Sequence, residues 1–213
     1  MEVLFEDDSI LVINKPGGIA TQSKGVAAKD LESECRKYRK AKGEAPEIYV
    51  VHRLDQPVSG ILVFAKTSEA AGRLSRGMQA EDFSKDYRAV VFKESHPEEF
   101  GKLTDYLVKD GKTNSSRVVS ENTQGAKEAS LEYELLEEDE KTAVLKVHLL
   151  TGRHHQIRVQ LSHAGFPILG DLKYGTEGSI AFSKEKEIPF VKLTAFHLEF
   201  KHPKTGKPMK FDI

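Results

Sequence analysis

VHRLDQPVSG (residues 51–60) places a histidine, an arginine and an aspartate around one leucine and then reaches a proline and a glycine. The residues that lead into it, IYVV (48–51), have the composition of a buried strand, and GILVFA (60–65) indicates a second strand. Pro57 and Gly60 mark the turn between them. Ionisable groups at a strand end beside a turn occur in functional sites and also in ordinary surface turns. The rest of the chain has to distinguish these two interpretations.

The composition is that of an ordinary globular protein. A chain of 213 residues fits one larger domain or two lobes that share a core. It is 38% hydrophobic and 31% charged, and no apolar run approaches the ~18 residues of a membrane helix. The N-terminus MEVLFEDDS lacks the basic-then-apolar order of a signal peptide, and the lone Cys35 excludes an internal disulfide. We expect a cytoplasmic protein that does not bind a membrane.

Positive charge is concentrated in two segments, although the net charge is only −1. Residues 192–213 carry five lysines against one glutamate and one aspartate, and RKYRKAK (36–42) is also basic. The acidic residues gather elsewhere, for example in EEDE (137–140). A solvated face explains any single run, but together the runs permit a polyanion on one side of the molecule.

Alternation and turn residues predict a chain made mostly of strands. Residues 3–15 form two short strands around an Asp-Asp-Ser turn, and residues 129–150 form the clearest hairpin, with the acidic run at its turn. Helices are expected over residues 30–42 and after an N-cap at Thr67 or Ser68. Because strands and helices do not alternate regularly, we expect an α+β fold with a mostly antiparallel sheet. Further strands are expected at GILVFAK, KDYRAVVFK, HQIRVQL, LTAFHLEF and GKPMKFDI.

The segment TGRHHQIRVQL (151–161) is the second concentration of polar residues. Read as a strand, it places His154, Gln156, Arg158 and Gln160 on one face, either a solvent face or the floor of a cleft, with His155 on the opposite face. The adjacent histidines then point in opposite directions, and no pair of histidines has the spacing of a zinc site, so we expect no metal. A nucleophilic serine motif and a phosphate-binding glycine loop are also absent from the sequence.

These stretches resemble the RluA-type RNA pseudouridine synthases. HRLDQPVSG is similar to that family's His-Arg-Leu-Asp signature, and other blocks match in the family's order. Val58, His154 and Gln160 stand where the family favours other residues. The matching blocks are LFEDDSILVINKPGG, HRLDQPVSGILVFAK, KDYRAVV, TGRHHQIRVQLSHAGFPILGDLKYG and LTAFHLEFKHPKTG.

The resemblance implies a single catalytic domain over residues 1–213, without an appended N-terminal RNA-binding domain. Its fold would be the pseudouridine synthase fold, a mostly antiparallel mixed sheet with a few flanking helices and a central active-site cleft. Its partner would be a stem-loop of ribosomal or transfer RNA, and it would act as a monomer without a cofactor or metal.

The resemblance also implies site residues. Asp55 would be the catalytic aspartate that isomerises uridine to pseudouridine, as nucleophile or as base. Arg158 would be its guanidinium partner and favour the ionised carboxylate. Tyr87 would be the active-site tyrosine that stacks on the displaced base, and Arg53 would fill the space left by the flipped nucleotide. Leu54 is expected in the core, and His52 is expected to be structural.

Two other functions remain open from the sequence. One is an inactive module of the same fold that binds and remodels RNA, against which the presence of Asp55, Tyr87 and Arg158 together argues. The other is an N-glycosidase, in which an aspartate detaches the base and water takes its place. Hydrolysis leaves an abasic site, whereas isomerisation conserves mass, so a mass measurement separates them.

Overall fold

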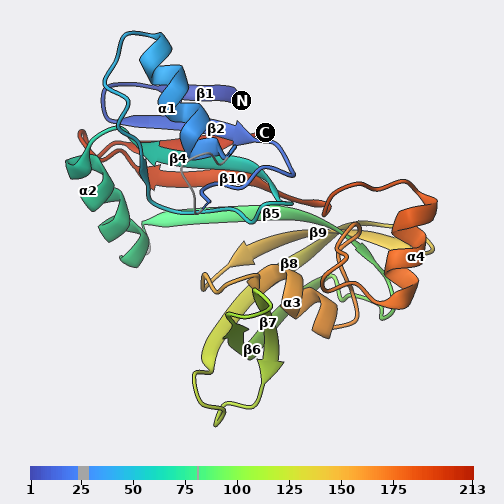
Figure 1. Cartoon of the computed structure of the whole chain (residues 1–213). Coiled ribbons are helices and arrows are strands. Elements are labelled where there is room, and N and C mark those ends of the chain that lie inside the picture. Colours follow the sequence, from blue (N-terminus) through green and yellow to red (C-terminus); the bar gives the residue numbers. More distant parts are fainter. Residues whose placement is uncertain (24–28, 81) are drawn as a thin grey trace. The chain divides into compact units, whose positions relative to one another are not determined.

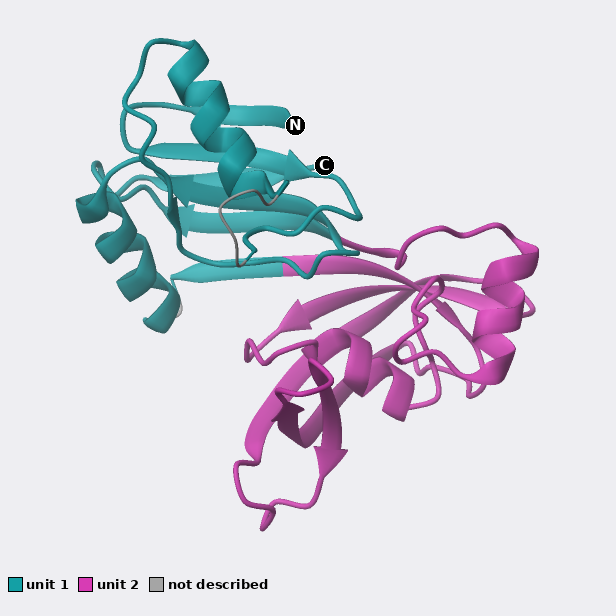
Figure 2. Cartoon of the chain, viewed as in Figure 1, with its two compact units in different colours: residues 1–85, 195–213 teal, residues 86–194 magenta. Residues whose placement is uncertain are grey.

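A computed structural model describes residues 1–23, 29–80 and 82–213 of the chain. Its contacts divide it into two compact units, coloured separately in Figure 2. Unit 1 consists of residues 1–85 and 195–213, and unit 2 consists of residues 86–194. Both units combine helices with a sheet whose strands pair mainly antiparallel, as expected for the α+β class (Figure 1).

The sheet of unit 1 has the strand order β1-β2-β4-β10, with β3 paired to β4 and β11 paired to β10. The pairs β1–β2, β2–β4, β3–β4 and β10–β11 are antiparallel. The predicted N-terminal hairpin and C-terminal pair are therefore confirmed. The bounds are β1 Glu2–Glu6, β2 Ile10–Lys15, β3 Tyr49–Val50, β4 Ser59–Ala65, β10 Leu193–Lys201 and β11 Pro208–Asp212.

Both faces of this sheet are buried, because consecutive residues of β2 from Ile10 to Ile13 are fully inaccessible. Helix α2 (Ser68–Gln79) packs on the face that carries Ile10 and Val12, through Ala70 and Leu74. The predicted cap is confirmed, since the Thr67 hydroxyl accepts the Ala70 N–H. The helix expected over residues 30–42 is α1 (Leu31–Ala41), which starts at an Asp30 cap and buries Leu31 and Cys35.

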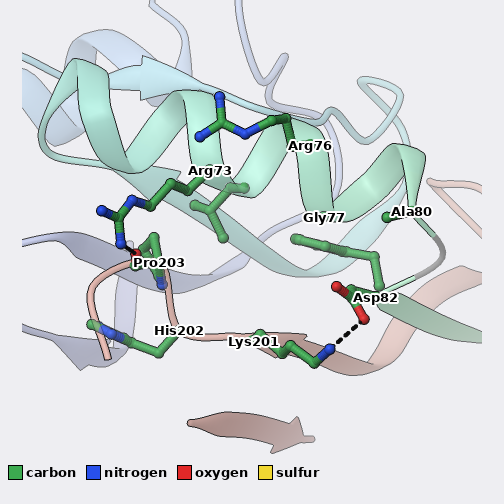
Figure 3. A pocket seen from close by; sticks show the side chains of 10 residues that line it. Arg73, Arg76, Gly77, Ala80, Asp82, Lys201, His202 and Pro203 are labelled. Carbon is green, nitrogen blue, oxygen red and sulfur yellow. Dashed lines mark hydrogen bonds and ion pairs between the residues drawn. The ribbon is translucent and has the colours of Figure 1, made fainter. Parts of the chain in front are cut away.

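Helix α2 and the turn between β10 and β11 border a hollow of about 260 Å³ (Figure 3). Arg73 donates from Nη1 to the Pro203 carbonyl at 2.8 Å, and Lys201 pairs with Asp82 at 2.7 Å. These contacts fasten the end of β10 and the turn after it to α2 and to Asp82, which follows α2 in the sequence. The basic C-terminal segment of the sequence thus contributes to the packing of unit 1.

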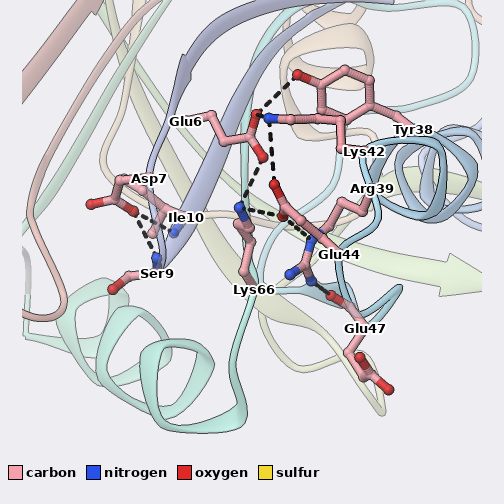
Figure 4. Close-up of polar contacts among 10 residues, drawn as sticks. All are labelled: Glu6, Asp7, Ser9, Ile10, Tyr38, Arg39, Lys42, Glu44, Glu47 and Lys66. Atoms are coloured by element: carbon pink, nitrogen blue, oxygen red, sulfur yellow. Dashed lines mark hydrogen bonds and ion pairs between the residues drawn. The ribbon is translucent and has the colours of Figure 1, made fainter.

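A cluster of ionic side chains joins the end of β1 to α1 and to the end of β4 (Figure 4). Glu6 accepts hydrogen bonds from Lys42 at 2.7 Å, Lys66 at 2.8 Å and the Tyr38 hydroxyl at 2.9 Å. Lys66 also pairs with Glu44 at 2.9 Å. Burial alone would raise the pKa of Glu6, but these donors outweigh burial and lower its pKa from 4.5 to about 2. Glu6 is therefore an anionic anchor for α1.

Glu6→Gln should lower the free energy of unfolding at pH 7 by about 1–2 kcal/mol, because two charged donors lose their partner. Since the folded-state pKa is depressed, the stabilisation by Glu6 is complete above pH 4.5 and is lost as the pH falls towards 2. Urea unfolding of both proteins at pH 7 and pH 3 should show a smaller difference at pH 3. Glu140→Gln, in an exposed turn, is the control, and an equal deficit at both pH values would contradict the ionic role.

The sheet of unit 2 has the strand order β5-β9-β8-β6-β7, and all four neighbouring pairs are antiparallel. The expected hairpin of residues 129–150 is confirmed as β8 and β9, with Leu131 opposite Leu149 and Leu135 opposite Leu145. The bounds are β5 Phe83–Phe92, β6 Phe100–Asp110, β7 Ser115–Val119, β8 Lys127–Glu138 and β9 Thr142–Leu149.

Two helices belong to unit 2, α3 (Gln156–His163) and α4 (Glu177–Glu185). The prediction of a strand at HQIRVQL was wrong, because this segment is α3. The shared polar face inferred for that strand was also wrong, because residues two apart in a helix do not point the same way. A solvent face is excluded too, since Gln156, Arg158 and Gln160 are as buried as their apolar neighbours. The helix is enclosed on all sides, so its polar side chains find partners inside the unit. The alternation in the sequence therefore does not report an exposed face.

Candidate functional site

The loop that carries Asp55 connects β3 to β4 in unit 1, and the residues on either side of Asp55 are anchored. The Thr21 hydroxyl donates to the Leu54 carbonyl at 2.9 Å and accepts the Leu54 N–H at 3.2 Å. The Gln56 carbonyl accepts the Gly18 N–H at 2.8 Å. Asp55 itself accepts the Val58 N–H through its carbonyl at 3.1 Å, which closes the turn. The backbone at Asp55 is therefore held between two fixed neighbours.

Lys15, at the end of β2, is a further support that the sequence did not reveal. Its side chain is fully buried, and Nζ donates to the carbonyls of Pro16, Ile19 and Gln56 at 3.0, 2.6 and 3.1 Å. Burial lowers the pKa of Lys15 from 10.5 to about 8, and the negative charge of Asp55 opposes part of this shift. A buried cation thus lies within electrostatic reach of Asp55 and holds the next carbonyl of its loop.

Arg53 and Leu54 point to different environments. Leu54 is buried, as expected, whereas Arg53 is exposed. Arg53 has no hydrogen bond or ion pair with the residues that the structure describes. It lines a hollow of about 470 Å³ together with residues of β3, α1 and α2, including Tyr49 and Ser75, and with Gln22, which precedes α1. A long cationic side chain is therefore available at the surface two residues before Asp55.

His52 fixes the start of the loop to β4. Its Nε2 accepts the Val63 N–H at 3.2 Å, and its ring packs edge-on against Phe83 at 5.7 Å. Burial, helped by the positive charge of Lys85, holds the pKa of His52 well below 6.5. A neutral ring that accepts a backbone hydrogen bond agrees with the structural role expected for His52.

Tyr87 lies in β5 of unit 2, opposite Val147 of β9. Its side chain is buried, with 6% of its surface exposed. Alternate residues of β5, including Ala89 and Val91, are also buried, so Tyr87 is on the core-facing side of the strand. Its position is thus set by the sheet of unit 2.

Arg158 lies in the first turn of α3 and forms a two-point ion pair with Asp171. Its Nε donates to Oδ2 at 2.7 Å and its Nη2 donates to Oδ1 at 2.8 Å. Both residues are buried, with 5% and 2% of their surfaces exposed. The guanidinium also lies over the ring of Tyr174, 5.0 Å from the ring centre. Asp171 and Tyr174 lie in the segment TGRHHQIRVQLSHAGFPILGDLKYG, but the sequence did not single them out as site residues, and no local periodicity indicates them.

The histidines before α3 do not point in opposite directions, and that prediction was wrong. The rings of His154 and His155 stack with centroids 3.7 Å apart and 25° between their planes. The cause is the backbone of His155, whose φ of 55° lies in the left-handed region and reverses the alternation expected for a strand. His155 hydrogen-bonds the Tyr174 hydroxyl at 2.6 Å, and His154 hydrogen-bonds Ser116 of β7 at 2.8 Å.

The other two departures from the family pattern are buried. Val58 packs in unit 1 with 2% of its surface exposed. Gln160 is fully inaccessible, and its Nε2 donates to Asp105 at 2.7 Å and to the Ala129 carbonyl at 3.0 Å. Its Oε1 has no hydrogen-bond partner within the described residues. Both side chains act in packing.

The structure therefore groups the expected site residues by unit. Arg53 and Asp55 share one loop of unit 1, and Tyr87 and Arg158 belong to unit 2. Within the described parts of the chain, no group of three or more His, Cys, Asp or Glu side chains is arranged to bind a metal ion. Among the same residues, no helix is both long enough and apolar enough to cross a membrane.

Comparison with known proteins identifies what this chain is similar to. Residues 9–163 match the sequence profile of a family described as RNA pseudouridylate synthase. A ribosomal large subunit pseudouridine synthase C of Haemophilus influenzae is 32% identical over 99% of this chain and 64% of its own length. A synthase D of Vibrio cholerae is 31% identical over 99% of this chain and 66% of its own length. The chain thus spans slightly less than two thirds of these curated relatives.

Solved structures show the same fold. The human RNA pseudouridylate synthase domain containing 1 superposes with a TM-score of 0.80, at 23% identity, over 100% of this chain and 82% of its own. The human RNA pseudouridylate synthase domain containing 4 gives a TM-score of 0.76 at the same identity. At this level of identity, the likeness concerns the arrangement of the backbone.

Proposed function

Because this chain belongs to the RNA pseudouridylate synthase family, we propose that it isomerises uridine to pseudouridine in structured RNA of the cytoplasm. The observation that supports this most strongly is that one continuous family match, residues 9–163, includes Asp55, Tyr87 and Arg158. The names of the curated relatives favour ribosomal RNA over transfer RNA as the substrate. We expect the active form to be a monomer.

The proposed reaction moves one base without changing its composition. The bond between C1′ and N1 of the uridine breaks, and a bond between C1′ and C5 forms. The proton on C5 then leaves, and N1, which carried no hydrogen while bonded to C1′, gains one. The reaction involves no net oxidation. What it needs is one well-placed carboxylate near the ribose, a partner that keeps this carboxylate ionised, and a group that assists removal of the C5 proton.

Asp55 is our candidate for that carboxylate, acting on the ribose as nucleophile or as base. Its loop is immobilised on both sides by Thr21, Gly18 and Lys15. A fixed backbone supports this role, because a reacting group has to be held in one orientation for efficient attack. We assign to Arg158 the stabilisation of the ionised Asp55, and to Tyr87 stacking on the displaced base and assistance in removing the C5 proton.

The direct test incubates the purified chain with ribosomal RNA that contains 5-tritiated uridine. Pseudouridine formation releases tritium, because C5 loses its hydrogen, and leaves the mass of unlabelled RNA unchanged. RNA binding without tritium release would identify an inactive RNA-binding module. Loss of a base from the RNA mass, with an abasic site, would identify an N-glycosidase.

Arg53 is our candidate for the side chain that replaces the flipped nucleotide. Extruding a stacked base costs roughly a few kcal/mol, and a guanidinium has the length, flat face and donors to recover part of it. If Arg53 recovers ~2–3 kcal/mol, Arg53→Ala should slow modification of a stem-loop by about 30- to 150-fold. A denatured analogue of the same sequence, whose base is already unstacked, should lose much less.

Single-turnover kinetics on both RNAs measure this difference. Arg76→Ala, which removes another exposed arginine of unit 1, controls for the general loss of positive charge and should affect both RNAs little. Equal losses on the stem-loop and on the denatured strand would show that Arg53 is a general phosphate contact, and the flipping role would then be abandoned.

A further inference from the structure

Arg158 is held on two sides within unit 2. Its planar guanidinium gives two parallel hydrogen bonds to the two oxygens of Asp171, at 2.7 and 2.8 Å. The ring of Tyr174 lies against the guanidinium, and the ring centre is 5.0 Å from Cζ of Arg158. A two-point contact fixes both the position and the plane of a guanidinium, which a single ion pair does not.

Asp171 is itself held in place by backbone groups of its own turn. Its Oδ1 also accepts the backbone N–H groups of Lys173 at 3.0 Å and Tyr174 at 3.2 Å. Its carbonyl accepts the Gly175 N–H at 2.8 Å. Because these backbone hydrogen bonds fix the Asp171 carboxylate, the carboxylate sets the orientation of the Arg158 guanidinium.

Packing of α3 alone does not require this pair. Val159 and Leu161 of α3 are buried, and Gln160 already links the helix to Asp105 of β6 and to the Ala129 carbonyl. A buried ion pair adds little net stability compared with well-packed apolar side chains. What the pair does provide is a guanidinium with a single defined direction.

We propose that Asp171 is the positioning residue for Arg158, so that the catalytic step depends on Asp171 although it does not contact the substrate. This inference rests on the proposed function, in which Arg158 stabilises the reacting carboxylate. Tyr174 contacts the flat face of the guanidinium, and Asp171 binds the guanidinium along its edge. Together they restrict its movement. Removal of Asp171 leaves the charge of Arg158 in place and removes its orientation.

The test compares Asp171→Asn, Asp171→Glu and the control Asp105→Asn, which removes a different carboxylate that accepts a hydrogen bond from α3. Asp171→Asn should reduce kcat by roughly 30- to 100-fold with KM within about threefold, because misplacing a reacting group by about 1 Å costs that much. Asp171→Glu keeps the charge and should recover part of the loss. Asp105→Asn should stay within about threefold of wild type.

A double-mutant cycle with Arg158→Lys then asks whether Asp171 acts through Arg158. If it does, the double variant should be no more than about threefold slower than the slower single variant. Multiplying losses would overturn the proposal, as would equal losses from Asp171→Asn and Asp105→Asn. If Asp171→Asn does not fold, Asp171→Glu carries the same comparison.

Nitrogen-edited NMR of the Arg158 Nε–H supplies a measurement that does not depend on activity. A slowly exchanging signal in wild type and Asp105→Asn that is lost in Asp171→Asn is expected. Its persistence in Asp171→Asn would contradict the proposal. If wild type releases no tritium, the proposed function fails, while the NMR signal still decides whether Asp171 positions Arg158.

Discussion

Asp55→Asn should release tritium from 5-tritiated uridine RNA at least about a thousandfold more slowly than wild type, a loss of ~4 kcal/mol in transition-state stabilisation. The amide keeps the shape of the side chain and removes the charge that the proposed chemistry needs. RNA affinity should stay within a few-fold, because phosphate contacts supply most of the affinity for nucleic acid. Single-turnover tritium release and filter binding on the same preparation measure the two quantities.

Asp82→Asn is the matched control for this experiment, because it removes a carboxylate of unit 1 that pairs with Lys201. Its activity should remain close to that of wild type. If Asp55→Asn retains more than a few per cent of wild-type activity in a preparation free of contaminating enzyme, Asp55 is not the group that carries the chemistry.

Gly60→Ala should destabilise the protein by at least about 4 kcal/mol, the largest stability effect that we expect from one methyl group. Gly60 has a φ of +120°, which residues with a side chain rarely adopt, and a Cβ there would lie 2.2 Å from the Ala195 carbonyl oxygen. The clash is with the backbone of β10, which cannot move away as a flexible side chain would. The glycine of VHRLDQPVSG therefore lets β4 and β10 approach each other.

Gly43→Ala separates the clash from the backbone conformation. Gly43 also has a positive φ, +76°, but a Cβ there would meet nothing within 4 Å. It should cost only about 1 kcal/mol. Urea unfolding of both variants gives the comparison, and a similar small loss at Gly60 would show that β10 does not press on this position.

The sequence predicted the elements whose burial is one-sided or whose turns are marked. The 129–150 hairpin and the helix capped by Thr67 are examples, because alternation and capping are local signals. The strand expected at residues 155–161 was wrong because α3 is buried all round, and its polar residues bind partners far away in the chain. Strands β6 and β7 and helix α4 were not predicted from their sequences.

The candidate site shows the same division. Asp55, Tyr87, Arg158 and Arg53 were identified because they lie in segments that resemble a known family. Lys15 and Asp171 also lie in matching segments, but the resemblance assigned them no role, because their contacts arise only on folding. Asp171 lies 13 residues after Arg158, so no local pattern links the two. The Gln56 carbonyl reaches Lys15 only when the 15–21 segment packs against the Asp55 loop. A lysine at the end of a mostly apolar strand is a signal that could have pointed to Lys15.

Nucleotide-resolution mapping of pseudouridine in ribosomal and transfer RNA, by carbodiimide modification and primer extension, tests the central claim most directly. The RNA would come from cells that lack the gene, complemented with wild type or with Asp55→Asn. We expect one or more pseudouridine stops to disappear on deletion, to return with wild type and to stay absent with Asp55→Asn. An unchanged map in all strains, or full restoration by Asp55→Asn, would contradict the proposal that this chain makes pseudouridine through Asp55.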